Sequence, residues 1–483
     1  MLNKIKKLEK AASVLEPSAE QRDTMYRQVG LRAEALLESL SEGKTYIADE
    51  GRSEQLDSDF SEDPGEFTQL LENFHAAVDY EGINAASGGH MGYIPGGGVF
   101  PSALGDFLAD IGNYYAGVKF ASPGAVKLEQ QLLQWMADLV GYPATAGGDL
   151  TSGGSMANLT AIVTAREMMG IRARDVERSC VYLTEGTHHC IDKALRAAGL
   201  GECPKRVIPM VAGCRMDERA FQQQLEKDKS AGFRPWLVVA SAGTTDTGAI
   251  DPIDAIADLA EQHSLWLHVD AAYGGFFLLC DEGKQLLKGI ERAHSVVLDP
   301  HKGMFLPYGS GALLVKDVAW LAQSQAYNAG YMQDAKTAEG VYSPADLSLE
   351  LTRPFRGMRF WLPLKLFGVA AFRAALTEKI WLARYFHEQL GQTPGWEMGP
   401  APDLSVVTFR FVPKHHDIDS FNEQLVKAVL DDGQVFLSST RIHNKFVIRL
   451  AVLHFRTHLQ HVDYVLNFLK NKSVALDQPA SGL

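Results

Sequence analysis

The chain has 483 residues, 46% of them hydrophobic and 22% charged, which is typical of globular proteins and excludes a disordered chain. This length exceeds what one hydrophobic core usually supports, so two or three domains are expected. Acidic residues (59) outnumber basic ones (46), and the net charge of −13 argues against nucleic acid and anionic membranes as partners, because both require a basic surface.

Residues 1–60 are charged and helical in pattern. Because such a segment has little core of its own, we expect residues 1–90 to be helical and to pack on another domain or a second subunit. The basic start is not followed by an apolar stretch, and no apolar run is long enough to span a bilayer, so neither a signal peptide nor a membrane span is expected. The five cysteines form no Cys-x-x-Cys pair, which favours a reducing, cytoplasmic location.

The middle of the chain alternates apolar runs with amphipathic helices, a pattern typical of a parallel sheet covered on both faces. A helix is predicted from Ser122-Pro123 to Gly141, and another begins near Asp251-Pro252. The apolar runs are 237–240, 265–269 and 295–298. We therefore predict a large α/β domain over residues 91–365.

A long helical stretch at 359–392, interrupted near Pro363, leads to a different pattern. Strand-like and helical segments now alternate, which predicts a smaller α+β domain over residues 366–483. These segments are the strands 406–411 and 446–452 and the helices 418–430 and 462–469.

The string Thr-Ser-Gly-Gly-Ser-Met-Ala-Asn at 151–158 opens a helical run. Glycines let the backbone approach an anion, and a helix N-terminus directs free N–H groups at it. Gly153, Gly154 and Ser155 are therefore candidates for holding a phosphate, although an ordinary helix start explains the segment equally well. The segment is neither a Walker loop nor Gly-x-Gly-x-x-Gly.

Two apolar runs end in residues suited to a flat cofactor. Asp270 ends the first run, where a carboxylate can keep a pyridinium nitrogen protonated, and the small Ala272 leaves room for a ring. Lys302 follows the second run and can form a Schiff base if burial and neighbours lower its pKa. The alternatives are a strand-end aspartate that caps a turn and an ordinary surface lysine. His301 can contact a phosphate or relay a proton, and Ser295 can face the phosphate.

The string Gly186-Thr-His188-His189-Cys190 supplies an imidazole that can stack on such a ring. A surface loop is the alternative. Metal binding is not expected, because no third ligand stands at a recognised spacing.

The strings His-Val-Asp-Ala-Ala-Tyr-Gly-Gly at 268–275 and Asp-Pro-His-Lys at 299–302 strongly resemble the group II decarboxylases that depend on pyridoxal 5′-phosphate (PLP). This family includes aromatic-L-amino-acid, histidine and glutamate decarboxylases, and the segments at 151–158 and 121–129 match it too. The resemblance implies fold type I: a large, mostly parallel, seven-stranded-type sheet flanked by helices, a small C-terminal α+β domain, and a homodimer with shared active sites.

Residue by residue, the resemblance implies a PLP site. Lys302 corresponds to the lysine that holds the cofactor covalently, Asp270 to the partner of the pyridine nitrogen, and His188 to the imidazole stacked on the ring. The remaining cofactor contacts are expected from Ala272 at the ring, Thr245 near the ring oxygen, and Gly154, Ser155, Ser295 and His301 at the phosphate.

Two regions depart from the family pattern. Members often carry His-Pro where this chain has Ser-Gly-Gly-His-Met-Gly-Tyr at 87–93, so a relative's substrate cannot be transferred directly. The loop tyrosine that protonates the product carbon is expected between about residues 330 and 353. Tyr342 is the better candidate and Tyr331 the alternative, although the spacing from Tyr342 to Arg353 is unusual.

The predicted function is removal of the α-carboxylate from an L-amino acid, with Lys302, His188, Tyr342 and Asp270 as catalytic residues. Aromatic substrates are favoured because Tyr93, Ile94, Pro95 and Tyr115 can line an apolar pocket. Glutamate, aspartate or diaminobutyrate would require a charged partner, for which Arg449 and Arg359 are candidates.

Three other classes of protein are alternatives to this function. An aminotransferase or an oxygen-consuming aldehyde synthase would use the same lysine and aspartate. A non-catalytic relative would be expected to lose one of these two residues, and both are present. A nucleotide-dependent oxidoreductase is disfavoured by the absence of Gly-x-Gly-x-x-Gly.

Overall fold

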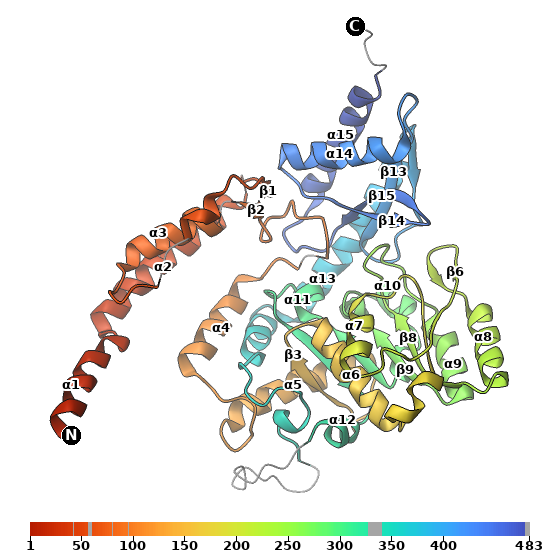
Figure 1. Cartoon of the computed structure of the whole chain (residues 1–483). Helices are drawn as coiled ribbons and strands as arrows, with labels where there is room; N and C mark the ends of the chain where they lie inside the picture. Colours follow the sequence, from red (N-terminus) through yellow and green to blue (C-terminus); the bar gives the residue numbers. More distant parts are fainter. Residues whose placement is uncertain (42, 57–59, 80, 95, 327–340, 479–483) are drawn as a thin grey trace.

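The computed structural model describes residues 1–41, 43–56, 60–79, 81–94, 96–326 and 341–478. They form a helical N-terminal arm, a large α/β body and a smaller C-terminal α+β part (Figure 1). Two short two-stranded sheets accompany them: β1 (Tyr46–Ile47) with β2 (Gly82–Ile83), and β6 (Met210–Val211) with β7 (Arg215–Met216).

The body contains the mostly parallel sheet that the resemblance implied. Its seven described strands run in the order β3-β11-β10-β9-β8-β4-β5, and β11 alone is antiparallel to its neighbours. The carboxyl ends of the other strands therefore meet at one edge. The strands are β3 (Gly147–Thr151), β4 (Ser179–Leu183), β5 (Lys205–Val207), β8 (Arg234–Ser241), β9 (Trp266–Asp270), β10 (Ser295–Leu298) and β11 (Gly311–Val315).

Helices cover both faces of this sheet. Alternate residues of β8 enter different cores: Val238 and Ala240 pack into the main one, Leu237 and Val239 into the one beside α6 and α7. Burial on both sides explains why the strand is a continuous apolar run. The body helices are α4 (Phe100–Gly112), α5 (Pro123–Val140), α6 (Gly154–Met168), α7 (Cys190–Ala197), α8 (Glu218–Ser230), α9 (Ile253–His263), α10 (Asp281–Leu286), α11 (Pro300–Gly303) and α12 (Val318–Gln325).

The C-terminal part is a four-stranded antiparallel sheet, in the order β12-β13-β15-β14, packed against helices. The predicted strands and helices of this part are confirmed. Its elements are β12 (Trp396–Met398), β13 (Val406–Phe411), α14 (Ile418–Asp432), β14 (Ser438–Ile442), β15 (Lys445–Ala451) and α15 (Leu459–Leu476).

Helix α13 (Gly357–Gly391) joins the body to the C-terminal part, so the boundary predicted at residue 365 falls inside a helix. Its backbone departs from helical geometry at Gly368 (φ 71°, ψ 159°), not at Pro363 as the sequence predicted. By length and composition this described helix would suffice to cross a membrane. Its side chains instead enter both hydrophobic cores. Phe372 and Leu376 pack in the core of the body, and Phe386 and Leu390 pack in the core of the C-terminal part.

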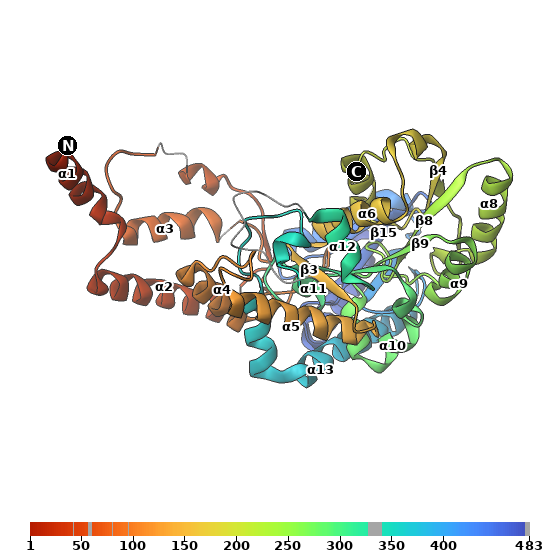
Figure 2. The same cartoon turned by 90° about the horizontal axis from the view of Figure 1, so that it is seen from below.

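The arm consists of α1 (Leu2–Ala12), α2 (Ala19–Ser39) and α3 (Phe67–Val78), and it projects away from the body in both views (Figures 1 and 2). No residue of α1 or α2 is buried, and Ala77 is the buried residue of α3. The ring of Tyr26 in α2 meets Phe107 of α4 edge to face, with centroids 5.8 Å apart. The arm therefore leaves most of its apolar side chains exposed.

Candidate active site

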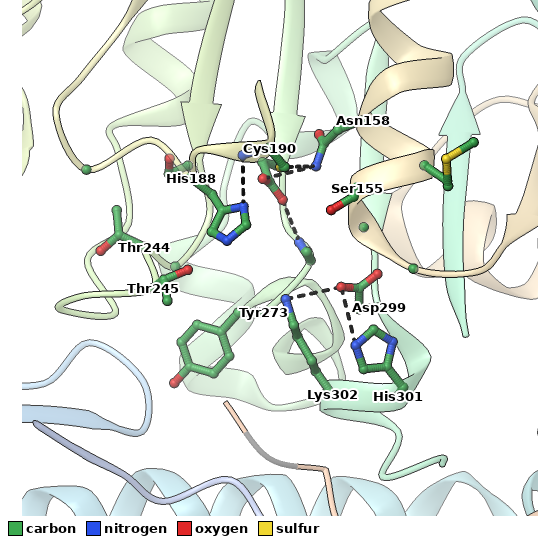
Figure 3. Close-up of a pocket in the computed structure, with 18 of the residues that line it drawn as sticks. Ser155, Asn158, His188, Cys190, Thr244, Thr245, Tyr273, Asp299, His301 and Lys302 are labelled. Atoms are coloured by element: carbon green, nitrogen blue, oxygen red, sulfur yellow. Dashed lines mark hydrogen bonds and ion pairs between the residues drawn. The ribbon is translucent and has the colours of Figure 1, made fainter. Parts of the chain in front are cut away.

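A cavity of about 290 Å³ opens at the carboxyl ends of the parallel strands (Figure 3). Ligands of open α/β sheets bind at this edge. The structure brings most of the candidate residues together there. They are Gly153, Gly154, Ser155, His188, Thr245, Asp270, Ala272, His301 and Lys302.

The N-terminus of α6 forms one wall of the cavity. The first N–H groups of a helix have no partner within the helix, so those near Gly154 and Ser155 can bind an anion. A Cβ on Gly154 would stand 2.8 Å from Oδ2 of Asp299 and 3.4 Å from Cβ of Ala272. Glycine therefore keeps this wall open, as expected for a phosphate cradle.

Lys302 lies in the cavity as one half of an ion pair. Its Nζ is 3.1 Å from Oδ2 of Asp299, and Nε2 of His301 lies 3.8 Å from the same oxygen (Figure 3). Burial alone would lower the pKa of Lys302, but Asp299 and Asp270 outweigh it and raise that pKa. This corrects the lowered pKa that the Schiff-base interpretation required: the lysine is held as an ammonium by two carboxylates.

Asp270 ends β9, and both of its carboxylate oxygens accept hydrogen bonds from the protein. Nδ2 of Asn158 donates to Oδ2 at 3.2 Å, and the backbone N–H of Ala272 donates to Oδ1 at 3.1 Å. Asn158 also donates to the sulfur of Cys190 at 3.3 Å. Burial raises the pKa of Cys190 to about 12, so its thiol stays protonated.

His188 and His301 are neutral side chains at neutral pH. Burial lowers the pKa of each, although nearby carboxylates act in the opposite direction. Nδ1 of His188 accepts the backbone N–H of Cys190, which leaves the ring facing the cavity. The neighbouring His189 is absent from the described cavity lining.

The prediction that Ser295 faces the phosphate is corrected, because this residue does not line the cavity. It begins β10, three residues before the carboxyl end where ligands bind, and it is fully buried. Its Oγ lies 2.9 Å from Nε1 of Trp266 and 2.8 Å from Nδ1 of His268. A hydroxyl engaged inside the sheet cannot hold the phosphate.

Tyr342 is also placed differently from the prediction. It lines a second cavity of about 560 Å³, together with Lys119 and Trp135, and packs against the buried cluster that includes Leu321. It is not among the described residues that line the cavity of Lys302. Its alternative, Tyr331, falls outside the described residues.

The residues suggested for substrate recognition are not in this cavity either. Tyr93 and Tyr115 are exposed, Ile94 is buried in the main core, and Pro95 lies outside the described residues. Arg449 donates to backbone oxygens of Tyr93, Thr245 and Asp246 and to Oγ of Ser438. Arg359 pairs with Asp106 at 2.7 Å. Both arginines are thus engaged in the fold.

The cavity lining also contains polar residues that the sequence did not single out, among them Asn158, Thr244 and Asp299. Each stood inside or beside a motif already singled out. Asn158 closes the string at 151–158, Thr244 precedes Thr245, and Asp299 begins Asp-Pro-His-Lys. The signal that could have identified them was their position: each is a polar residue within or next to a motif expected at the ligand-binding edge of the sheet.

The cavity fits PLP by the chemistry of its donor set. It offers a primary amine in Lys302, a carboxylate in Asp270 for a ring nitrogen, and a helix N-terminus with His301 for a phosphate. In addition, Oδ1 of Asp299 is buried and makes no hydrogen bond within the described protein. A bound group with donors would satisfy it.

Comparisons with known proteins agree with this chemistry. Residues 50–412 match the family model described as the pyridoxal-dependent decarboxylase conserved domain. The aromatic-L-amino-acid decarboxylase of Bacillus atrophaeus is 34% identical over 79% of this chain and 80% of its own length. The phenylacetaldehyde synthase of Petunia hybrida is 29% identical over 80% of each chain.

A solved structure has the same fold. The crystal structure of Oryza sativa TDC with PLP and tryptamine superposes with a TM-score of 0.89. It is 24% identical, and the match covers 96% of this chain and 99% of that one.

Proposed function

Since the chain belongs to the pyridoxal-dependent decarboxylases and is therefore a PLP-dependent carboxy-lyase acting on an amino acid, we propose that its substrate is an aromatic L-amino acid. The observation that carries this proposal is the absence of arginine from the described cavity lining. A substrate with a second carboxylate would require such a cation, because Lys302 is committed to the cofactor. The similarity to an aromatic-L-amino-acid decarboxylase supports the same choice.

The roles of the protein groups follow from their positions. Lys302 would hold the cofactor, the N-terminus of α6 and His301 would bind its phosphate, Asp270 would keep its ring nitrogen protonated, and His188 would stack against the ring. When bound, PLP supplies an electron sink for the pair left by the breaking bond between Cα and the carboxylate. The overall reaction converts the amino acid and one proton into an amine and CO₂.

We propose that the working unit is a homodimer. The arm buries none of the side chains of α1 or α2, while large apolar side chains on α2, α3 and α4 stay exposed, including Val29, Phe74, Leu108 and Ile111. A second copy would cover such a surface. Tyr342, which is not among the described lining residues of its own subunit's cavity, would then serve the cavity of the partner.

The test measures CO₂ release by the PLP-loaded protein from tryptophan, tyrosine, phenylalanine, glutamate and 2,4-diaminobutyrate. We expect release from the aromatic amino acids and formation of their amines. Lys302→Ala should abolish both the visible band of bound PLP and the release of CO₂. Preference for glutamate or diaminobutyrate would overturn the substrate assignment.

The phenylacetaldehyde synthase relative favours one second candidate, oxidative conversion to an aldehyde. That reaction consumes O₂ and water and yields aldehyde, CO₂, ammonia and hydrogen peroxide. The same assay separates the two, because a decarboxylase yields amine without peroxide.

A further inference from the structure

We infer that Ser295, His268 and Asn158 form a directional hydrogen-bond chain that positions the Asp270 carboxylate against the ring nitrogen of bound PLP. The inference deepens the proposed function and rests on the role given there to Asp270. It also gives Ser295 a role at a distance from the phosphate: this residue acts through His268 and Asn158.

The chain is continuous between two strands and a helix. Nε1 of Trp266 donates to Oγ of Ser295 at 2.9 Å, and that oxygen lies 2.8 Å from Nδ1 of His268. Nε2 of His268 lies 2.6 Å from Oδ1 of Asn158, whose Nδ2 donates to Asp270 at 3.2 Å. Trp266, His268 and Asp270 occupy alternate positions of β9, so their side chains share one face of the sheet.

The two ends of the chain fix its direction. An indole N–H can only donate, and an ionised carboxylate can only accept. Because Asn158 donates to Asp270 through Nδ2, its carbonyl oxygen faces His268, which must donate from Nε2 and accept at Nδ1. Ser295 donates to Nδ1 of His268, so His268 carries its proton on Nε2 and donates it to Asn158. The amide of Asn158 is thereby oriented with its nitrogen toward Asp270.

Burial gives this direction its energetic weight. Ser295, His268 and Asn158 are each at most 1% exposed, so a donor or acceptor left there without a partner would be destabilising. Burial also lowers the pKa of His268 to about 4, and its ring is neutral with a single N–H. Reversing the histidine tautomer would turn the Asn158 carbonyl toward the carboxylate. Ser295 disfavours that reversal, because its own buried hydroxyl proton would then lose its acceptor, Nδ1 of His268.

Two pairs of variants test the hydrogen-bond chain in the PLP-loaded enzyme. Ser295→Ala and His268→Phe break it, whereas Ser295→Thr keeps the hydroxyl and His268→Gln keeps an acceptor and a donor. The direct readout is the ¹⁵N chemical shift of the ring nitrogen, using PLP labelled at that atom. We expect the breaking variants to move this resonance toward that of a neutral pyridine and to lower kcat about 10- to 100-fold, with a smaller effect on KM. The conservative variants should retain most of both properties.

His294→Phe is the matched control. His294 directly precedes β10, its Nδ1 accepts the N–H of Leu267, and its ring stacks on Trp266 without joining the hydrogen-bond chain. We expect this variant to keep the wild-type ring-nitrogen resonance, which separates positioning from general damage to the sheet. An unchanged resonance and kcat in both Ser295→Ala and His268→Phe would overturn the inference. A wild-type protein that forms no PLP complex would instead overturn the proposed function and the inference together.

Discussion

Lys302 and Asp299 form an ion pair that cofactor binding must open. The charged lysine cannot add to the aldehyde of PLP, and Asp299 is the partner that contributes most to keeping it charged. Asp299→Asn should therefore lower the pKa of Lys302 and leave more uncharged amine at neutral pH. It should also remove a negative charge from the wall that receives the phosphate.

We expect the apo form of Asp299→Asn to bind PLP faster than wild type at pH 7, on the order of tenfold, the factor that about 1.4 kcal/mol produces. The measurement is the growth of the visible band after mixing with PLP. Asp281→Asn is the control, because Asp281 pairs with Lys284 at the same spacing of three residues but in solvent. Equal or slower binding by Asp299→Asn would contradict this account of the pair.

At this scale the sequence predicts the identity of cofactor-contacting side chains better than their protonation or direction. Lys302, Asp270 and His188 stand in recognisable strings, and all three line the cavity. The raised pKa of Lys302 depends on Asp299 and Asp270, two carboxylates whose distances only the folded chain defines. Ser295 shows the same limit, since its motif gave its neighbours but not its position within the folded sheet, three residues before the carboxyl end of β10.

At the scale of elements, the start of α6 is the part most sensitive to added volume. Gly154→Ala places a Cβ 2.8 Å from the Asp299 carboxylate in the phosphate wall. We expect PLP affinity to fall about tenfold, which corresponds to about 1.4 kcal/mol. A PLP titration followed by the quenching of protein fluorescence measures this change.

Gly124→Ala is the matched control for that substitution. Gly124 lies in the first turn of α5, where an added Cβ meets nothing within 4 Å. Its PLP affinity should stay at the wild-type value, with stability unchanged or slightly higher because alanine favours a helix. If both variants bound PLP equally well, the α6 terminus would not be the phosphate site.

Elements with local signals were predictable, and those defined by neighbours were not. The helix at 122–141 was marked by a proline at its start and a glycine at its end, and α5 follows with Gly141 in a left-handed conformation (φ 86°). Strand β3 carried no such signal, because it begins with two glycines, which are depleted in strands. A Cβ on Gly148 would stand 2.0 Å from the carbonyl oxygen of Leu313, so the close approach of β11 explains the glycine.

At the scale of the whole molecule, the proposed dimer predicts complementation between two inactive or impaired variants. A Lys302→Ala chain keeps Tyr342, and a Tyr342→Phe chain keeps Lys302. If each cavity uses Tyr342 of the other subunit, a mixed dimer contains one intact cavity and one doubly defective cavity. Co-expression of differently tagged chains should then give mixed dimers with about half of the wild-type activity per dimer. No gain over either parent would argue for cavities built from one subunit.

Acid should destabilise the fold through two buried histidines, His90 and His454. Burial lowers the pKa of His90 to about 4 and that of His454 to about 3, whereas an unfolded histidine titrates near 6.5. The unfolded chain thus binds more protons as the pH falls below about 6.5, and the free energy of unfolding decreases until the folded pKa values are reached.

At pH 5 this loss is about 2 kcal/mol for each of these two histidines, since one pKa unit corresponds to about 1.36 kcal/mol. The melting temperature should therefore decrease when the pH is lowered from 7 to 5. His90→Phe should reduce that fall, because the ring already packs between those of Tyr93 and Phe436. A pH dependence identical to that of wild type would exclude His90 as a cause.

The antiparallel strand β11 has a consequence for biosynthesis. It inserts between β3 and β10, so the strand that leads into the phosphate-binding helix joins the sheet only through residues synthesised about 160 positions later. A nascent polypeptide cannot complete the site for its vitamin-derived cofactor before Val315 has emerged from the ribosome. Stalled fragments that stop short of that point should accumulate without the yellow colour of the finished enzyme.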